Sequence, residues 1–285
     1  MFAITGVTGQ VGGVVINHLL DARLPVRAVA RNADKGKVWK DRGAELALAE
    51  MIDADALAAA FSGADGVFLL IPPTFDPTPG FPEVRAVIDA LTTALLKARP
   101  ARIVCLSTIG AQATEPNLLS QLGLVEQALS ALSLPIAFLR AAWFMENAAW
   151  DVAAARETGI VPSFLQPLHK AYPMVSVADV GERAATLLRE TWTGTRIVEL
   201  QGPEPVTPDD IADAFSRALG RPVSAEVVAR DSWEGLFRGQ GMTNPTPRIR
   251  MIDGFNDGWI RFEGEPEKGT TTLDTAIRRL VEAAR

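Results

Sequence analysis

The chain of 285 residues contains one cysteine, two histidines and one tyrosine. A single cysteine, Cys105, excludes an internal disulfide, and its place in the apolar run RIVCLST predicts a buried strand residue. The histidines, His18 and His169, lack the spacing of metal ligands, so we expect no metal site. The only tyrosine is Tyr172. The sequence is therefore poor in the residues that metal, disulfide and phenol chemistry require.

Clustered positive charge and long apolar runs are also absent from the sequence. The formal net charge is −6 with no basic stripe, which argues against nucleic acid as a partner, because such binding depends on clustered Lys and Arg. No apolar stretch reaches about 18 residues, and the N-terminus does not resemble a signal peptide. We therefore expect a cytoplasmic protein without membrane contact. A hydrophobic content of 48% is enough for one large α/β domain with a smaller lobe.

Apolar runs alternate with helical periods along the first part of the chain, which predicts a doubly wound parallel sheet. Two strands, at 67–71 and 102–106, are apolar on both faces, as expected in the middle of a sheet that helices cover on both sides. We expect one α/β domain over 1–150 built on this sheet, and a smaller α/β lobe over 151–285 from which some segments return to the first domain. The expected strands are 2–5, 26–30, 45–48, 66–71, 102–107, 135–140 and 196–202, and the expected helices are 10–22, 33–41, 54–61, 83–98 and 118–132.

A glycine-rich turn follows the first predicted strand. Gly6, Gly9 and Gly12 have the spacing G-x-x-G-x-x-G and stand directly before a helix. Such a turn lets the backbone approach a pyrophosphate, while the N–H groups at the helix start face the anion. This context predicts a dinucleotide site, and the alternative is a tight strand-to-helix turn of another α/β protein.

Two other loops and one helix start carry local signals. The loop 72–82 contains five prolines and begins where a central strand ends, a usual place for ligand contacts, although it could be a stiffened surface connection. The stretch 238–250 is rich in Gly, Pro and polar residues and predicts a mobile loop near the substrate. Thr207 is expected to cap a helix that begins with Pro208, Asp209 and Asp210.

Seven segments together resemble one known family. The chain is similar to the NmrA-like group of atypical short-chain dehydrogenase/reductases, and within it to the quinone oxidoreductases and triphenylmethane reductases. This resemblance implies a Rossmann domain that binds NADP(H) or NAD(H), closed by a small lobe over a small-molecule substrate. The segments are AITGVTGQVG, VRAVARN, VFLLIPP, RIVCLSTIGA, LPIAFLRAAWFMEN, YPMVSVADVG and VELQGPEPVT.

The end of the second strand bears on the choice of coenzyme. NAD-preferring proteins place a carboxylate there, whereas this chain has Arg31, with Lys35 one turn further on. Both cations can pair with a 2′-phosphate, which favours NADP(H); if they are only a solvated basic strand end, NAD(H) stays possible. With the positions implied by the resemblance, the predicted coenzyme-binding residues are Gly6, Thr8, Gly9, Gln10, Val11, Gly12, Arg31, Lys35, Glu50, Met51, Ile71, Pro72, Pro73, Ser107 and Phe144.

The usual catalytic pair of the related reductases is missing. A Tyr and a Lys normally stand four residues apart on one helix face, where the lysine lowers the tyrosine pKa. The resemblance puts Leu118 and Leu122 at these positions, with Glu126 at the usual downstream acid. No catalytic residue is assigned, and the catalytic candidates are Ser107, Thr108, Asn147 and Tyr172. Lys170 and Tyr172 are the remaining candidates for polar contact with a substrate.

Two function classes remain open. A quinone accepts hydride readily and its oxyanion can take a proton from water, so an NADP(H)-dependent oxidoreductase acting on a quinone or similar activated molecule fits the missing pair. A non-catalytic redox sensor that binds the dinucleotide and reports to a protein partner fits it too. An epimerase of nucleotide sugars is a third reading, but its chemistry normally needs the missing tyrosine. The oligomeric state stays open.

Overall fold

The computed structural model describes residues 1–284 of the chain. Its first half alternates strictly between strands and helices, at bounds close to those predicted. These elements are β1 (Phe2–Ile4), α1 (Gln10–Asp21), β2 (Val26–Ala30), α2 (Ala33–Asp41), β3 (Glu45–Leu48), α3 (Ala54–Phe61), β4 (Gly66–Leu69), α4 (Pro82–Ala98) and β5 (Arg102–Thr108).

The central sheet has eight strands, all parallel, and it confirms the predicted α/β fold. After β5 come α5 (Ser120–Ser130) and β6 (Ile136–Ala141), while α7 (Val177–Leu187), β10 (Thr195–Gln201) and β12 (Glu267–Lys268) return to the sheet from later in the chain. The strand order is β3-β2-β1-β4-β5-β6-β10-β12. Because every strand is parallel, all their carboxyl ends meet at one edge, which is where such sheets bind ligands.

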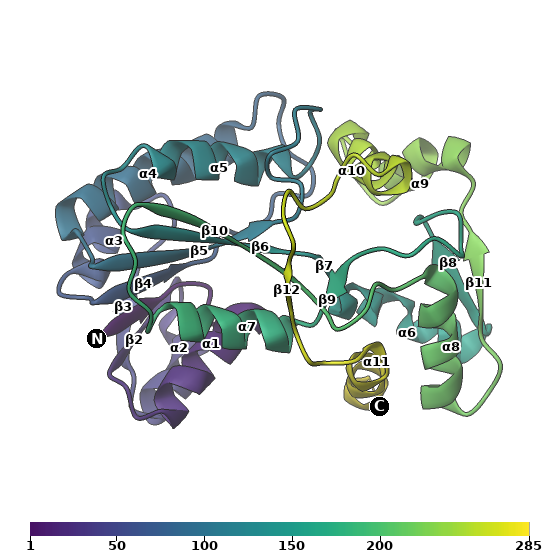
Figure 1. Cartoon of the computed structure of the whole chain (residues 1–285), viewed down its shortest axis with the longest axis horizontal. Coiled ribbons are helices and arrows are strands. Elements are labelled where there is room, and N and C mark those ends of the chain that lie inside the picture. The colour runs from purple at the N-terminus through teal and green to yellow at the C-terminus, as the bar shows by residue number, and fades with distance from the viewer. Residues whose placement is uncertain (285) are drawn as a thin grey trace.

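Helices cover both faces of this sheet. Figure 1 shows α4 and α5 above it, and α1, α2 and α7 below it. Consecutive strand residues accordingly enter different cores: Val104 packs with α1 and α7, and Cys105 packs with α3, α4 and α5. Cys105 is fully buried, and burial raises the pKa of its thiol, as expected for a structural strand residue.

The remaining elements form two short parallel sheets and a helical cluster. β7 (Trp143–Phe144) pairs with β9 (Met174–Val175), and β8 (Ile160–Ser163) pairs with β11 (Ser224–Val227). The capping box predicted at Thr207 is present, since its hydroxyl accepts from the Asp210 N–H at 3.0 Å and the Asp210 carboxylate accepts from the Thr207 N–H at 2.8 Å. The helices are η1 (Met145–Asp151), α6 (Val152–Glu157), α8 (Pro208–Leu219), η2 (Arg230–Ser232), α9 (Trp233–Gly239), α10 (Thr246–Asp257) and α11 (Leu273–Ala283).

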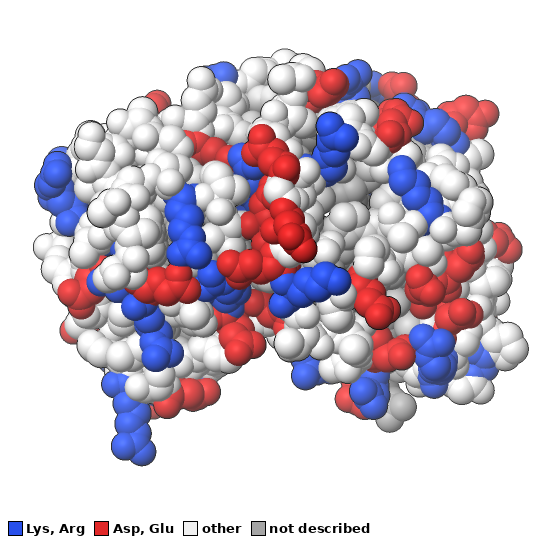
Figure 2. All heavy atoms as spheres, viewed as in Figure 1, with Lys and Arg blue, Asp and Glu red and all other residues white. Residues whose placement is uncertain are grey.

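The segment 258–272 connects α10 to α11 by crossing the edge of the large sheet (Figure 1). It pairs with β10 through β12, and the Glu199 carboxylate accepts N–H bonds from Glu263 and Gly264. Figure 2 shows acidic side chains gathered along the middle of this face, where the segment runs. The segment between α10 and α11 is thereby joined to the large sheet at its β10 edge.

The structure corrects the prediction of one mobile loop over 238–250. Helix α9 extends to Gly239, and α10 begins at Thr246, so only 240–245 connects them. Pro245 and Pro247 stand at the start of α10, where a missing N–H costs nothing. The prolines in this stretch therefore mark a helix start rather than an irregular loop.

Candidate functional site

The glycine-rich turn leads from β1 into α1 at the carboxyl edge of the sheet. Gly6 has φ +66°, a conformation that favours glycine, and Gly9 is the residue before the first helical turn. A Cβ at Gly12 would lie 2.5 Å from the carbonyl carbon of Gly6 and closer still to its oxygen, so only glycine allows this approach. The turn presents the start of α1 with little side-chain cover, which is the arrangement that a pyrophosphate needs.

A hollow of about 450 Å³ adjoins this turn. Trp39 of α2 lines this hollow, and its indole N–H donates to the Val7 carbonyl at 3.0 Å. Lys35 contributes a cation to the wall, and Arg31 is exposed just after β2. A basic hollow beside a glycine turn has the chemistry to hold a phosphorylated nucleotide. The lining residues are Val7, Thr8, Gly9, Gly13, Lys35, Val38 and Trp39.

The other predicted coenzyme contacts lie at the same sheet edge or just behind it. Thr8 and Gln10 are exposed at the start of α1, whereas Val11 is buried in the core below the sheet. Glu50 and Met51 follow β3. Ile71, Pro72 and Pro73 follow β4, and Phe144 ends β7 half-buried.

Ser107 is the predicted hydroxyl at the end of β5, and the structure places it in a buried charged network. Its hydroxyl donates to Glu126, whose carboxylate also accepts from Arg140 at 2.7 and 3.0 Å. Arg140 stands between Ser107 and Glu199 in the register of three neighbouring strands, and it also pairs with Glu263. These carboxylates raise the pKa of Arg140 against the opposing effect of its burial. The hydroxyl proton of Ser107 is therefore already engaged, and Glu126 has a structural partner.

The positions of the usual Tyr and Lys are apolar in the structure as well. Leu118 is buried in the turn before α5, and its N–H donates to the Pro247 carbonyl at 2.9 Å. Leu122 lies on α5 and packs against the core above the sheet. Neither side chain can transfer a proton.

The remaining polar candidates differ in burial and in the hydrogen bonds that their side chains already make within the protein. Tyr172 is buried, its hydroxyl donates to the Gln166 carbonyl at 2.8 Å, and burial raises its pKa to about 12. The Lys170 ammonium donates to the Phe255 carbonyl at 3.1 Å, and the Thr108 hydroxyl donates to the Ile109 carbonyl. Asn147 is exposed on η1. Most of these groups thus bond to the protein itself.

Asp76, in the proline-rich loop after β4, is a residue that the sequence analysis missed. Its carboxylate accepts the Thr243 N–H and hydroxyl, both at 2.8 Å, and the Asn244 N–H at 2.6 Å. These hydrogen bonds hold the pKa of Asp76 below its usual value. They tether the α9–α10 connection to the carboxyl edge of the sheet, across 167 residues of chain.

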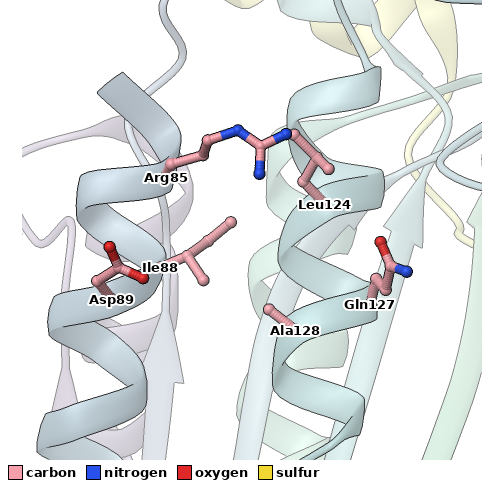
Figure 3. Close-up of a pocket in the computed structure, with 6 residues that line it drawn as sticks. All are labelled: Arg85, Ile88, Asp89, Leu124, Gln127 and Ala128. Carbon is pink, nitrogen blue, oxygen red and sulfur yellow. The ribbon is translucent and has the colours of Figure 1, made fainter. Parts of the chain in front are cut away.

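A second hollow, of about 290 Å³, lies between α4 and α5 on the outer surface. Figure 3 shows Arg85, Ile88 and Asp89 on α4 facing Leu124, Gln127 and Ala128 on α5. Both helices lie above the sheet, whereas α1 and the glycine-rich turn lead to the layer below it (Figure 1). This groove is therefore separate from the candidate site.

Residues 1–284 contain neither a cluster of metal-ligating side chains nor a helix that could cross a membrane. Nowhere in residues 1–284 do three His, Cys, Asp or Glu side chains come together as metal ligands would. Within that range, none of the helices combines the length and apolarity that a membrane crossing requires.

Comparisons with known proteins agree with this geometry. The chain is 28% identical to an NAD(P)H azoreductase of Xenophilus azovorans, over 85% of this chain and 82% of that protein. It is 31% identical to a (4-alkanoyl-5-oxo-2,5-dihydrofuran-3-yl)methyl phosphate reductase of Streptomyces griseus, over 81% of this chain and 78% of that protein.

One solved structure shows the same fold over nearly the whole chain. It is an Escherichia coli NADPH-dependent quinone oxidoreductase complexed with NADPH, with a TM-score of 0.80 and 21% identity, covering 98% of this chain and 99% of the other. A family model, the NmrA-like family, matches residues 1–241, which include the glycine turn, the eight-stranded sheet up to β10 and helix α9. The chain belongs to the NmrA-like family.

Proposed function

We propose that this protein is an NADPH-dependent reductase of a small activated acceptor such as a quinone. The observation that carries the proposal is the glycine turn, whose closed geometry and adjoining basic hollow fit a phosphorylated dinucleotide. Family membership and relatives with reductase names support it. When bound, NADPH supplies a hydride, which together with one proton converts a quinone to a hydroquinone and leaves NADP⁺.

The residues of the glycine turn would hold the pyrophosphate, and Arg31 and Lys35 would pair with the 2′-phosphate. Arg31 is exposed at the end of β2, and Lys35 already lines the hollow. A guanidinium there makes charge-assisted bonds to phosphate oxygens and offers no acceptor to a free ribose hydroxyl. We therefore expect NADPH to bind more tightly than NADH.

The coenzyme preference is tested by fluorescence titration of NADPH and NADH into wild type and Arg31→Ala. We expect the variant to lose about tenfold in NADPH affinity and little in NADH affinity. Lys37→Ala is the control, because Lys37 lies on α2, just after Arg31 in the chain, and pairs with Asp41 instead. Equal wild-type affinities for the two coenzymes would refute the preference.

An activated acceptor suits the site because no dedicated proton donor stands in the usual place. Leu118 and Leu122 occupy those positions, and the Ser107 hydroxyl donates to Glu126. Since the hydroquinone oxyanion can be protonated by water, the protein needs mainly to align the acceptor with the coenzyme.

A redox sensor would need an exposed face for its partner. Among the described residues from 145 onward, the large hydrophobic side chains that are strongly exposed are Trp150, Ile197, Val227 and Leu236, on four different elements. Scattered single residues are ordinary on protein surfaces, so this distribution favours the enzyme over the sensor.

The reaction is tested by following NADPH oxidation with a panel of small quinones. Turnover that depends on enzyme concentration supports the reductase, and Gly12→Ala serves as the coenzyme-binding variant that should abolish it. Coenzyme binding without turnover of any quinone would instead support the sensor.

A further inference from the structure

Arg248, in the first turn of α10, is a half-buried cation without an acidic partner. It makes no ion pair with the side chains of residues 1–284, and its side chain donates only to the Met242 sulfur, at 3.9 Å. Desolvation lowers its pKa, and no neighbouring carboxylate counters that effect. By contrast, the buried Arg140 and the half-buried Arg183 each pair with at least two carboxylates. Arg248 therefore carries a charge that the fold leaves unneutralised.

Aromatic rings hold the Arg248 guanidinium in place. Its central carbon lies 4.5 Å from the ring centre of Phe237 and 5.8 Å from that of Trp150. Phe237 is buried and stacks on Phe164 at 5.3 Å, whereas Trp150 is 72% exposed. One ring thus anchors the arginine, and the other offers an open face beside it.

This arginine lies where the helical cluster meets the carboxyl edge of the sheet. The preceding residue, Pro247, accepts the N–H of Leu118, which follows β5. Trp150 lies on η1, six residues after Phe144 at the end of β7. In Figure 1, α10 lies above and to the right of β7, and α9 lies above β8 and β11. The glycine turn opens at this same edge, because every strand of the sheet is parallel.

We propose that Arg248 binds an anionic group of the substrate, so that the acceptor is a conjugated molecule bearing a carboxylate, sulfonate or phosphate. The guanidinium forms charge-assisted hydrogen bonds to the oxyanion, and the exposed face of Trp150 stacks on the conjugated ring. This inference rests on the proposed reductase function and names its substrate class. Arg248 is a specificity-determining residue in this account, with no part in the transfer of hydride or proton.

The test compares 1,2-naphthoquinone with its 4-sulfonate as acceptors for NADPH oxidation. In wild type we expect the lower KM for the sulfonate. Arg248→Met keeps the apolar stem against Phe237 and should reduce the selectivity, measured as the ratio of the two KM values, by about tenfold or more. Arg248→Lys should restore part of it, and kcat for the sulfonate should change less than KM.

Arg230→Met is the matched control. Arg230 also lies over an aromatic ring, Trp233 at 4.8 Å, but it is already paired with Asp253. Its loss should leave the selectivity between the two quinones unchanged. An equal change in KM for both acceptors in Arg248→Met, or no change in either, would overturn the proposal.

A binding measurement separates this inference from the reductase function. Quenching of tryptophan fluorescence by the sulfonate is followed in protein saturated with NADP⁺, where no hydride is available. Tight binding that is lost in Arg248→Met supports the anion site even if neither quinone is reduced, in which case the reductase proposal alone fails. Equal binding to wild type and Arg248→Met overturns the anion site whatever the turnover.

Discussion

Gly12→Ala tests the link between the glycine turn and function. The added methyl group would lie 2.5 Å from the Gly6 carbonyl carbon and 3.0 Å from the Thr5 oxygen. These are backbone atoms, so relief requires movement of the turn or of α1 rather than of a side chain. Overpacking of this kind costs about 1–3 kcal/mol. In a chain of this size, that corresponds to a melting temperature lower by roughly 3–10 °C.

Gly13→Ala is the neighbouring control on the same helix. A methyl group there would meet ordinary contacts, with Trp39 at 3.8 Å and the Val7 oxygen at 3.9 Å. Replacing a helical glycine by alanine stabilises by about 0.5–1 kcal/mol, so the melting temperature should rise slightly. The two substitutions add the same group one residue apart, and the structure predicts opposite signs.

Thermal unfolding with and without NADPH provides the assay. We expect NADPH to raise the melting temperature of wild type and to have little effect on Gly12→Ala, because the displaced turn no longer fits a pyrophosphate. If Gly12→Ala unfolds at the wild-type temperature and is stabilised by NADPH as wild type is, the close approach of turn and helix does not matter and the reasoning fails.

Three further predictions concern charged groups. Arg140→Met leaves buried carboxylates uncompensated and should cost about 3–5 kcal/mol in urea unfolding, against less than about 1 kcal/mol for Arg217→Met at an exposed pair. Burial raises the pKa of Asp151 from 3.8 to about 7, so ionisation of this carboxyl increasingly destabilises the folded state as pH rises between these values. Asp151→Asn should therefore raise the free energy of unfolding by on the order of 2 kcal/mol at pH 8 and leave it unchanged at pH 3. Equal effects at the two pH values would refute this prediction. Asp76→Ala should speed amide hydrogen exchange at Thr243 and Asn244. Because the pKa of Asp76 is lowered, these two amides should be protected from exchange in wild type above about pH 4, and the protection should be lost as pH falls through that lowered pKa.

Local sequence patterns were enough to predict much of the fold. The β1–α1 turn, the strand and helix alternation up to β5, and the Thr207 capping box each depend on residues within a few positions of one another. Backbone sterics, hydrophobic period and capping act over that range, so the sequence alone determines them. The family resemblance, stated from seven segments, is confirmed by the family match. The coenzyme contacts and the division at residue 150 stay predictions.

The side-chain networks around the sheet depend on contacts between residues that are far apart in the sequence. Asp76 meets Thr243 across 167 residues, and the Ser107 hydroxyl meets Glu126 across 19. The Arg248 guanidinium on α10 lies beside the Trp150 ring on η1. The sequence predicts a loop over 238–250, whereas the structure has Arg248 in the first turn of a helix. No local pattern encodes which side chain will lack a partner, because that depends on every element packed around it. The sequence determined the glycine-rich turn between β1 and α1, because that turn depends on neighbouring residues. Only the tertiary structure determined which charged side chains, such as Arg140, have ion-pair partners and which, such as Arg248, have none among residues 1–284.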